Sequence, residues 1–235
     1  MSSTGGQLFI DIGNSRIKTR FRINGEWSEI QTFDPGHITP ITSLLPDAGL
    51  VVLSSVSQRN FSILEPLLSN IPTTRLTVDN LSAHISYDST GTLGIDRVLA
   101  AIGAWHTLGS GCVAIDAGTA TTIDLITAEG LFSGGVIMPG ISLFESGLQQ
   151  HTDLPAVNRS LPEQWPPRST ETALKWGITG SYLEAVRSHI RRYSEHDTSL
   201  SIVTTGGDGE WLSKQLDQDT IYIPDLVFRG MGYVV

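Results

Sequence analysis

The same short pattern stands near the start of the chain and again at its middle. At 8–15 and at 113–120, an apolar run ends in Asp-x-Gly and is followed by polar residues. Each copy leads into a second run rich in β-forming residues, at 17–22 and at 121–126. The aspartates of the two copies lie 105 residues apart, close to half of the 235-residue chain. Two related halves are the economical interpretation, and the alternative is a coincidence between two ordinary hairpins.

Hydrophobic periodicity predicts a mixture of strands and helices. The predicted strands are 8–12, 17–22, 50–54, 112–116, 121–126, 131–138, 201–205 and 220–223, and the predicted helices are 60–69, 97–107, 142–150 and 169–193. A polar, proline-containing stretch at 158–168 is predicted to be a loop. Strands mixed with helices indicate an α/β architecture. With the repeat, they predict an N-terminal lobe at 1–109 and a C-terminal lobe at 110–235.

Composition narrows the functional classes. The chain has 24 Asp and Glu against 15 Lys and Arg, a formal charge of −9. This balance argues against a general nucleic-acid binder, because such proteins neutralise phosphates with basic side chains. Apolar runs are too short for a membrane span, residues 1–6 lack a secretory pattern, and Cys112 has no second cysteine to pair with. We therefore expect a cytoplasmic protein with no membrane or nucleic-acid partner.

Several common catalytic motifs are absent from the sequence. There is no Gly-Lys pair, which excludes a P-loop, and there is no G-x-S-x-G or H-E-x-x-H. The stretch 109–114 matches G-x-G-x-x-A but precedes a predicted strand, which is the wrong order for a dinucleotide fold. The aspartates and glycines at strand ends remain as candidates.

Both copies of the repeat offer groups that suit a nucleotide. In the first, Gly13 allows a tight turn, and backbone N–H groups with the polar side chains of 14–18 can hold phosphate oxygens. Asp11 can carry a hydrated Mg²⁺, which prefers one or two carboxylates plus phosphate oxygens. In the second, Asp116 is followed by three hydroxyl side chains within 119–122. For either copy alone, a structural hairpin is an equally good interpretation.

Three further segments carry candidate groups. At 94–97, an adjacent Asp and Arg open a predicted helix. Asp96 is there either a helix cap or a base, and Arg97 can hold an anion. At 134–140, a predicted strand enters a turn flanked by Gly and Pro, and a predicted helix follows. Gly206 and Gly207, after the predicted strand 201–205, allow a flat group such as adenine to lie on the backbone.

Taken in this order, the segments resemble the type III pantothenate kinases of bacteria. The resemblance is carried by 11–18, Tyr87 with 94–97, 116–122, 134–140, 169–170, 205–207 and the closing segment 226–230. It implies the actin-like ATPase fold, with two ribonuclease-H-like lobes and ATP in the cleft between them. It also implies transfer of the ATP γ-phosphoryl group to the primary hydroxyl of pantothenate. The product is 4′-phosphopantothenate, the first intermediate towards coenzyme A.

The resemblance also implies roles for individual residues. Asp96 resembles the catalytic base, Asp11 a residue near Mg²⁺, and Asp116 the ligand of K⁺ or NH₄⁺. The implied ATP contacts are Asp11, Ile12, Gly13, Asn14, Ser15, Arg16, Ile17, Lys18, Thr119, Gly206 and Gly207. The implied pantothenate contacts are Tyr87, Gly94, Ile95, Asp96, Arg97 and Thr170. Family proteins are homodimers with the substrate pocket at the subunit interface, so a dimer is implied as well.

Two other functions stay open at this point. One is a kinase of the same fold that acts on another alcohol. The other is a non-catalytic transcription accessory or regulatory homologue. The presence of Asp11, Asp96 and Asp116 favours an enzyme, because a purely binding protein has less need of all three carboxylates. Ser15 stands where the family commonly has threonine, and it keeps the hydroxyl.

Overall fold

The computed structural model describes residues 5–216 and 219–235. The chain forms two compact units. Unit 1 runs from the N-terminal end to Thr107 and also takes in Gly130–Phe132 and Asp225–Val235, and unit 2 comprises Leu108–Glu129 and Ser133–Pro224. The first boundary lies close to the predicted one at 109. The C-terminal segment, which the sequence placed in the second lobe, is part of unit 1.

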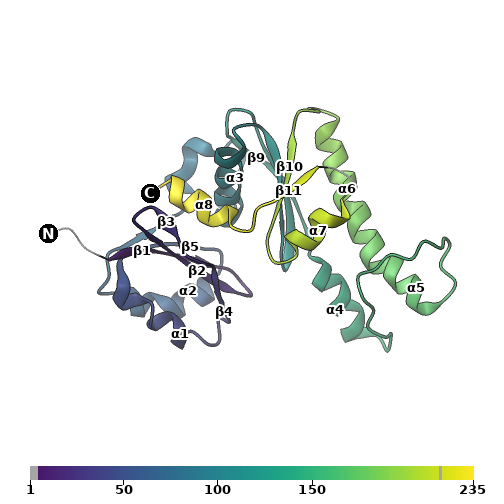
Figure 1. Cartoon of the computed structure of the whole chain (residues 1–235), viewed down its shortest axis with the longest axis horizontal. Coiled ribbons are helices and arrows are strands. Elements are labelled where there is room, and N and C mark those ends of the chain that lie inside the picture. Colours follow the sequence, from purple (N-terminus) through teal and green to yellow (C-terminus); the bar gives the residue numbers. More distant parts are fainter. Residues whose placement is uncertain (1–4, 217–218) are drawn as a thin grey trace. The chain divides into compact units, whose positions relative to one another are not determined.

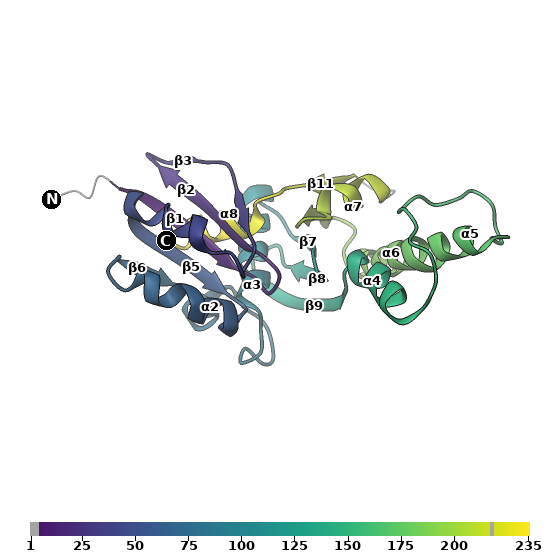
Figure 2. The ribbon, with the colours of Figure 1, turned by 90° about the horizontal axis from the view of Figure 1, so that it is seen from below.

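The sheet of unit 1 has β1 at its centre. β1 pairs antiparallel with β2 and parallel with β5, and the strand order is β3-β2-β1-β5-β6, with β4 also on β2 (Figure 2). The strands are β1 (Gly6–Ile12), β2 (Ile17–Ile23), β3 (Glu26–Trp27), β4 (Gln31–Phe33), β5 (Ala48–Ser55) and β6 (Thr73–Arg75).

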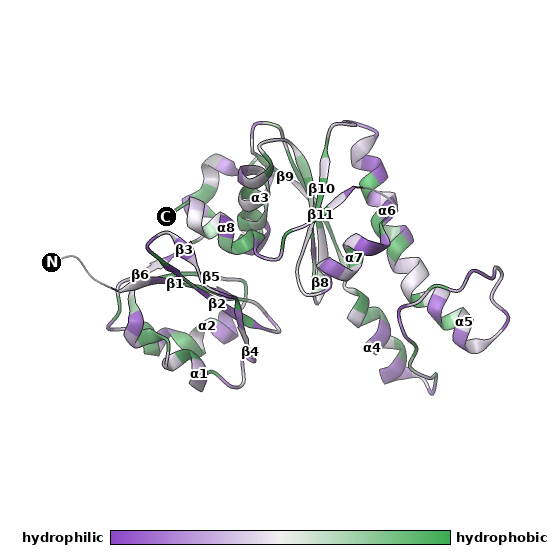
Figure 3. Ribbon diagram, viewed as in Figure 1, coloured by the Kyte–Doolittle hydropathy of each residue, from purple (hydrophilic) through white to green (hydrophobic). Residues whose placement is uncertain are grey.

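Alternation along β1 decides which helices cover each face of this sheet. Leu8, Ile10 and Ile12 point into one core, which they share with residues of α1 (Thr39–Thr42) and α2 (Gln58–Leu64). Phe9 and Asp11 belong to the opposite face, where Figure 1 shows α3 (Ile95–Leu108) and α8 (Leu226–Tyr233). Much of α3 and α8 is coloured as hydrophobic in Figure 3. Asp11 therefore lies on the face covered by the C-terminal helix.

Unit 2 repeats the strand order of unit 1. Its order is β11-β10-β7-β8-β9, with β7 antiparallel to β8 and parallel to β10. The central strand of each sheet thus pairs with the strand that follows it and with a later parallel one. The strands are β7 (Cys112–Ala117), β8 (Ala120–Ile126), β9 (Phe132–Pro139), β10 (Ser201–Thr205) and β11 (Thr220–Tyr222). The predicted α/β class with two similar lobes is confirmed.

Helices of unit 2 pack on one face of this sheet. A core of Val113, Ile115 and Ala117 meets the apolar side of α6, including Tyr182 and Val186. The helices of this unit are α4 (Ile141–His151), α5 (Thr170–Lys175), the π-helix η4 (Trp176–Gly180), α6 (Ser181–Ser194) and α7 (Gly209–Gln215). The predicted helix 169–193 is therefore three consecutive helical segments. The predicted loop 158–168 has no helix or strand.

Several elements of unit 1 differ from the sequence predictions. The helix predicted at 97–107 begins two residues earlier, at Ile95, and the one predicted at 60–69 ends as a 3-10 turn, η2 (Glu65–Leu68). The short strands β3, β4 and β6 and the helices α1 and α8 have no counterpart among the predictions. Two further 3-10 helices are η1 (Leu45–Asp47) and η3 (Asp79–His84). No helix in 5–216 or 219–235 combines the length and the apolar character needed to cross a membrane.

Glycine allows α3 and α8 to cross closely. A β-carbon on Gly103 would overlap the carbonyl oxygen of Leu226, and one on Gly230 would overlap that of Leu99. Glycine lowers helix propensity by about 1 kcal/mol relative to alanine, which explains why the sequence pattern did not predict α8. At this crossing, the close contact of the two backbones outweighs that cost.

Candidate active site

The β1–β2 turn forms the first candidate loop. The N–H of Gly13 donates to the carbonyl of Arg16 at 3.0 Å, which closes the turn. Asn60 of α2, which is 4% exposed, donates from Nδ2 to the carbonyls of Gly13 (2.7 Å) and Asn14 (3.1 Å). The buried side-chain amide of Asn60 therefore fixes the shape of this loop.

Residues 11–18 differ in what they can offer to a ligand. Asn14, Ser15 and Arg16 are exposed at the tip of the turn. Ile12 and Ile17 are fully buried and belong to the core of unit 1. The two isoleucines can therefore present only main-chain groups, whereas the three tip residues can also present side chains.

Asp11 is a half-buried carboxylate at the end of β1. In the sheet it stands opposite Lys18 on β2 and Ser54 on β5, and Ser54 Oγ donates to its Oδ1 at 3.0 Å. Burial raises the pKa of Asp11, against the opposing effects of Lys18 and the Ser54 hydrogen bond. The protein thus stabilises the ionised carboxylate of Asp11 less than water does. A cation bound there would favour the ionised form. Asp11 fits the predicted role near Mg²⁺ in this respect.

Asp96 is the second residue of α3 and lies in its first turn. Because α3 begins at Ile95, Asp96 lies one residue inside the helix and not before it. Asp96 Oδ1 accepts the N–H of Arg97 at 2.9 Å. A pocket of about 320 Å³ is lined by residues 91–95, which lead into α3, by 55–56 at the end of β5 and by 75–78. Gly94 and Ile95 thus line a pocket that can take a small molecule.

Tyr87 and Arg97 meet at one aromatic ring. The guanidinium carbon of Arg97 lies 5.2 Å from the ring centre of Phe132, and the Tyr87 ring contacts the same ring edge-on, with 5.7 Å between centres. A β-bridge between Ile85 and Phe132 fixes the spacing. Arg97 is 7% exposed, whereas Tyr87 is 41% exposed. The structure therefore gathers two of the predicted substrate contacts around Phe132.

Asp116 occupies in unit 2 the position that Asp11 has in unit 1. It is the last residue but one of the central strand β7, opposite Thr122 on β8 and Thr205 on β10. Gly206 has a φ of +88°, and a β-carbon there would clash with Oδ1 of Asp116 and lie 2.5 Å from the carbonyl oxygen of Ala117. Only glycine fits this close approach. Carboxylate and carbonyl oxygens, the donors that hard cations prefer, thus lie close together here.

Two other loops of unit 2 join the same region. The N–H of Gly140, between β9 and α4, donates to the carbonyl of Thr119 at 2.9 Å, and the N–H of Asp208 donates to that of Ala117 at 2.9 Å. Thr119 itself is exposed. Gly207 has open space where a β-carbon would point. These contacts join the turn at 117–119 to Gly140 and to the residue that follows the Gly206–Gly207 turn.

Thr170 is the first residue of α5 and is exposed. The preceding residue, Ser169, caps the helix: its Oγ accepts the N–H of Thr172 at 3.2 Å, and Thr172 Oγ1 accepts the N–H of Ser169 at 3.2 Å. A π-helix follows α5 directly, and such segments are frequent at functional sites. Thr170 thus stands exposed in the first turn of a capped helix.

Sequence reasoning missed several supporting residues. Asn60, Ser54 and Phe132 lie in segments without a motif, and no sequence signal points to them. Arg159, in the loop predicted at 158–168, pairs through two nitrogens with Glu145 of α4 (2.7 and 3.0 Å) and through Nη1 with Asp208 (2.6 Å). These carboxylates raise the pKa of Arg159. Arg159 thereby ties its loop to the residue that follows Gly206 and Gly207.

Within the described parts of the chain, no three His, Cys, Asp or Glu side chains gather in a way that could hold a metal. The candidate cation sites instead rest on single carboxylates, Asp11 and Asp116. A Mg²⁺ ion that arrives with a nucleotide needs one or two protein carboxylates, because phosphate oxygens and water complete its shell.

Comparison with known proteins gives one family. The model of the type III pantothenate kinase family matches residues 7–192. A type III pantothenate kinase from Methylacidiphilum infernorum is 30% identical over 236 residues, which cover 97% of this chain and 87% of that protein.

Solved structures share the fold at lower identity. A Baf family transcriptional activator from Campylobacter jejuni superposes with a TM-score of 0.68 at 24% identity, over 97% of this chain and 96% of that one. MreB5 of Spiroplasma citri, bound to AMPPNP, gives 0.53 at 11% identity, over 98% and 96% of the two chains. These likenesses establish the actin-like ATPase fold. With the family match over most of its length, the chain belongs to the type III pantothenate kinase family.

Proposed function

We propose that this protein transfers the γ-phosphoryl group of ATP to the primary hydroxyl of pantothenate, giving ADP and 4′-phosphopantothenate. Family membership supports the reaction. The observation that carries the assignment of residues is the position of Asp96, in the first turn of α3, with Gly94 and Ile95 lining a pocket of about 320 Å³. Arg97 and Tyr87 gather at Phe132 in the same unit.

Asp96 acts as the base in this proposal. An alcohol is a poor nucleophile at neutral pH, and its proton becomes acidic only as the new P–O bond forms. The Asp96 carboxylate accepts that proton while the bond from the γ-phosphorus to the bridging oxygen breaks, and ADP leaves with the electron pair. Gly94, Ile95, Arg97, Tyr87 and Thr170 hold the acceptor. Positioning of this kind contributes much of the rate enhancement in phosphoryl transfer.

The two strand-end loops bind ATP. At the tip of the first loop, the main-chain N–H groups and exposed side chains of Asn14, Ser15 and Arg16 contact phosphate oxygens. Thr119 and the Gly206–Gly207 turn contact the rest of the nucleotide. Asp11 would hold the Mg²⁺ that accompanies ATP, which would neutralise part of the phosphate charge. Asp116 would hold K⁺ or NH₄⁺, together with the nearby carbonyl oxygen of Ala117. A protein of charge −9 needs such cations to accept a polyanion.

The substitution Asp96→Asn tests the base. We expect kcat with pantothenate to fall at least about 100-fold, because general-base catalysis contributes about 10²–10⁴-fold. The assay is ADP release in MgATP and K⁺, and Asp47→Asn, an exposed aspartate of the same unit, serves as the matched control. A folded Asp96→Asn protein with turnover near that of the control contradicts the assignment.

Two further measurements test the rest of the proposal. A panel of acceptor alcohols separates pantothenate from other acceptors, and absence of turnover with every acceptor favours a non-catalytic homologue. Turnover in K⁺, NH₄⁺ and Na⁺ tests Asp116: the Asp116→Asn protein is expected to lose the preference of the parent protein. We also place the protein in the cytoplasm as a homodimer, and its mass in solution by light scattering tests the dimer.

A further inference from the structure

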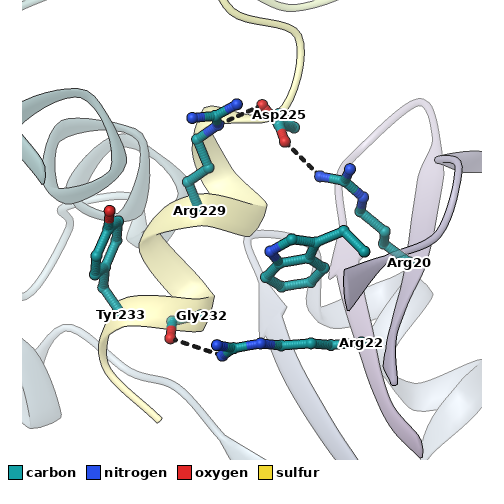
Figure 4. A pocket seen from close by; sticks show the side chains of 7 residues that line it. Arg20, Arg22, Asp225, Arg229, Gly232 and Tyr233 are labelled. Carbon is teal, nitrogen blue, oxygen red and sulfur yellow. Dashed lines mark hydrogen bonds and ion pairs between the residues drawn. The ribbon is translucent and has the colours of Figure 1, made fainter. Parts of the chain in front are cut away.

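A second pocket lies in unit 1, at the C-terminal helix. Its volume is about 310 Å³, and β2, β3 and α8 supply its lining. The lining residues are Arg20, Arg22, Trp27, Asp225, Arg229, Gly232 and Tyr233. Figure 4 shows Arg20 and Arg22 extending from the strands toward α8, and Arg229 on α8 beside Asp225. None of these residues belongs to the proposed kinase site.

Charge in this pocket is opposite to that of the whole protein. Three guanidinium groups face one carboxylate, Asp225, although the chain as a whole carries −9. Asp225 is shared: Oδ2 accepts from Arg20 Nη1, and Oδ1 accepts from Arg229 Nε at 2.7 Å. The pocket therefore keeps a formal excess of two positive charges, in a chain with only 15 Lys and Arg.

Arg22 has the least compensation of the three arginines. In the part of the chain that the structure describes, its hydrogen bond goes from Nη1 to a neutral acceptor, the carbonyl of Gly232, at 3.3 Å. The ring of Trp27 lies 5.5 Å from its guanidinium carbon and 5.0 Å from that of Arg20. Contact with this indole restricts the motion of both guanidinium groups. Each guanidinium has about five N–H donors, and several of them stay available to a ligand.

A purely structural role explains only part of this arrangement. The Arg20–Asp225 pair, with side chains 16% and 8% exposed, fixes α8 to β2 and accounts for one arginine. Arg229 of α8 pairs with the same carboxylate, so Arg22 is the arginine of this pocket whose position the ion pairs do not explain. Planar guanidinium groups recognise carboxylate and phosphate through paired hydrogen bonds, and a pocket of roughly 300 Å³ suits a small molecule.

This pocket is distinct from the proposed acceptor pocket. Arg229 also donates from Nη1 to Thr107 Oγ1 at 3.4 Å, near the C-terminal end of α3. Asp96 lies in the first turn of the same helix. At 1.5 Å per residue, the two positions are separated by roughly 16 Å along the helix axis. An anion at the arginines is therefore beyond the reach of Asp96.

We propose that this arginine pocket, defined by Arg20, Arg22 and Arg229 over Trp27, binds a small organic oxyanion through its phosphate or carboxylate group. The excess positive charge attracts the anion, and Arg22 and Arg229 hold its oxygens. The aromatic rings of Trp27 and Tyr233 line the space for the attached organic group. Arg20 stays with Asp225 and positions the others.

Calorimetric titration of the whole protein, without ATP or pantothenate, tests this proposal. The probes are inorganic phosphate, phenyl phosphate and benzoate, which separate the phosphate group, the carboxylate group and the aromatic body. The variants are Arg22→Gln and Arg229→Gln, and the control is Arg59→Gln, which removes an exposed arginine of unit 1 outside the pocket. We expect saturable binding of phenyl phosphate or benzoate, at least tenfold weaker in both pocket variants and within twofold of wild type in the control.

Three results overturn the proposal: no saturable binding of any probe, pocket variants that bind as tightly as wild type, or an equal loss in Arg59→Gln. Arg22→Lys keeps the charge but not the fork, so an intermediate affinity supports a guanidinium site if Arg22→Gln fails to fold. Phosphate bound only at the nucleotide loops leaves both pocket variants unaffected, which counts against the arginine pocket. Kinase turnover is measured separately, so failure of one proposal is distinguishable from failure of the other.

Discussion

The carboxylate of Asp11 is placed where burial works against its charge. A raised pKa in the folded protein means that the folded state binds the Asp11 proton more tightly than the unfolded chain does. The contribution of this group to stability is therefore greatest below the ordinary pKa of 3.8 and is lost as pH rises through the raised value. A cation bound at the ionised Asp11 would restore part of the lost stability, as expected of a cation-binding residue.

Replacement of Asp11 tests this trade between stability and binding. We expect Asp11→Asn to lower MgATP turnover at least about 100-fold, because the Mg²⁺ contact is lost. Its Tm should equal or exceed that of wild type at pH 8, since the ionised carboxylate is gone, and the advantage should shrink at pH 4. Thermal unfolding without nucleotide at the two pH values measures this difference. A Tm several degrees below wild type at pH 8 contradicts it.

The thiol of Cys112 is predicted to be inert in the native protein. Its side chain is fully buried at the start of β7, and burial raises its pKa to about 12. At pH 8 the thiolate is therefore scarce as well as inaccessible. A chromogenic disulfide reagent should modify less than one tenth of the protein in an hour, and all of it within minutes in denaturant. Rapid modification of the native protein would show that β7 opens readily.

The crossing of α3 and α8 depends on two glycines, one in each helix. Gly230→Ala places a β-carbon into the Leu99 carbonyl, and we expect a loss of about 1–3 kcal/mol in the free energy of unfolding, as overpacked sites show. Gly147→Ala in α4 is the matched control, because open space surrounds that position. The control should gain about 0.5–1 kcal/mol from helix propensity. Denaturant titrations of the three proteins measure both values.

Prediction from sequence succeeded where an element has its own periodic signal. The eight predicted strands and four predicted helices all have counterparts, because their apolar residues repeat at the strand or helix period. β3 and β4 were missed because strands of two or three residues are stabilised by pairing with β2 and not by their own pattern. α8 was missed because its two internal glycines are required by contacts with distant residues of unit 1, at Leu99 and at Trp27.

At the scale of the whole molecule, the repeat was the most informative signal. It predicted two lobes, and it placed Asp11 and Asp116 at corresponding strand ends. The arginine pocket gave no such signal, because Arg20 and Asp225 are 205 residues apart in the chain. Asn60 and Arg159 also gave no signal, because each acts through contacts with loops that are distant in the sequence.

Because residues 225–235 complete unit 1, the order of synthesis differs from the order of assembly. A ribosome releases all of unit 2 before α8 emerges, so the surfaces of α3 and Trp27 that α8 contacts stay without that cover until the end of synthesis. The nascent chain has to keep this apolar surface from other chains during that interval. All residues of unit 2 are synthesised before unit 1 is complete, so unit 2 can finish folding first. This order is the reverse of the usual one, in which the N-terminal domain folds first.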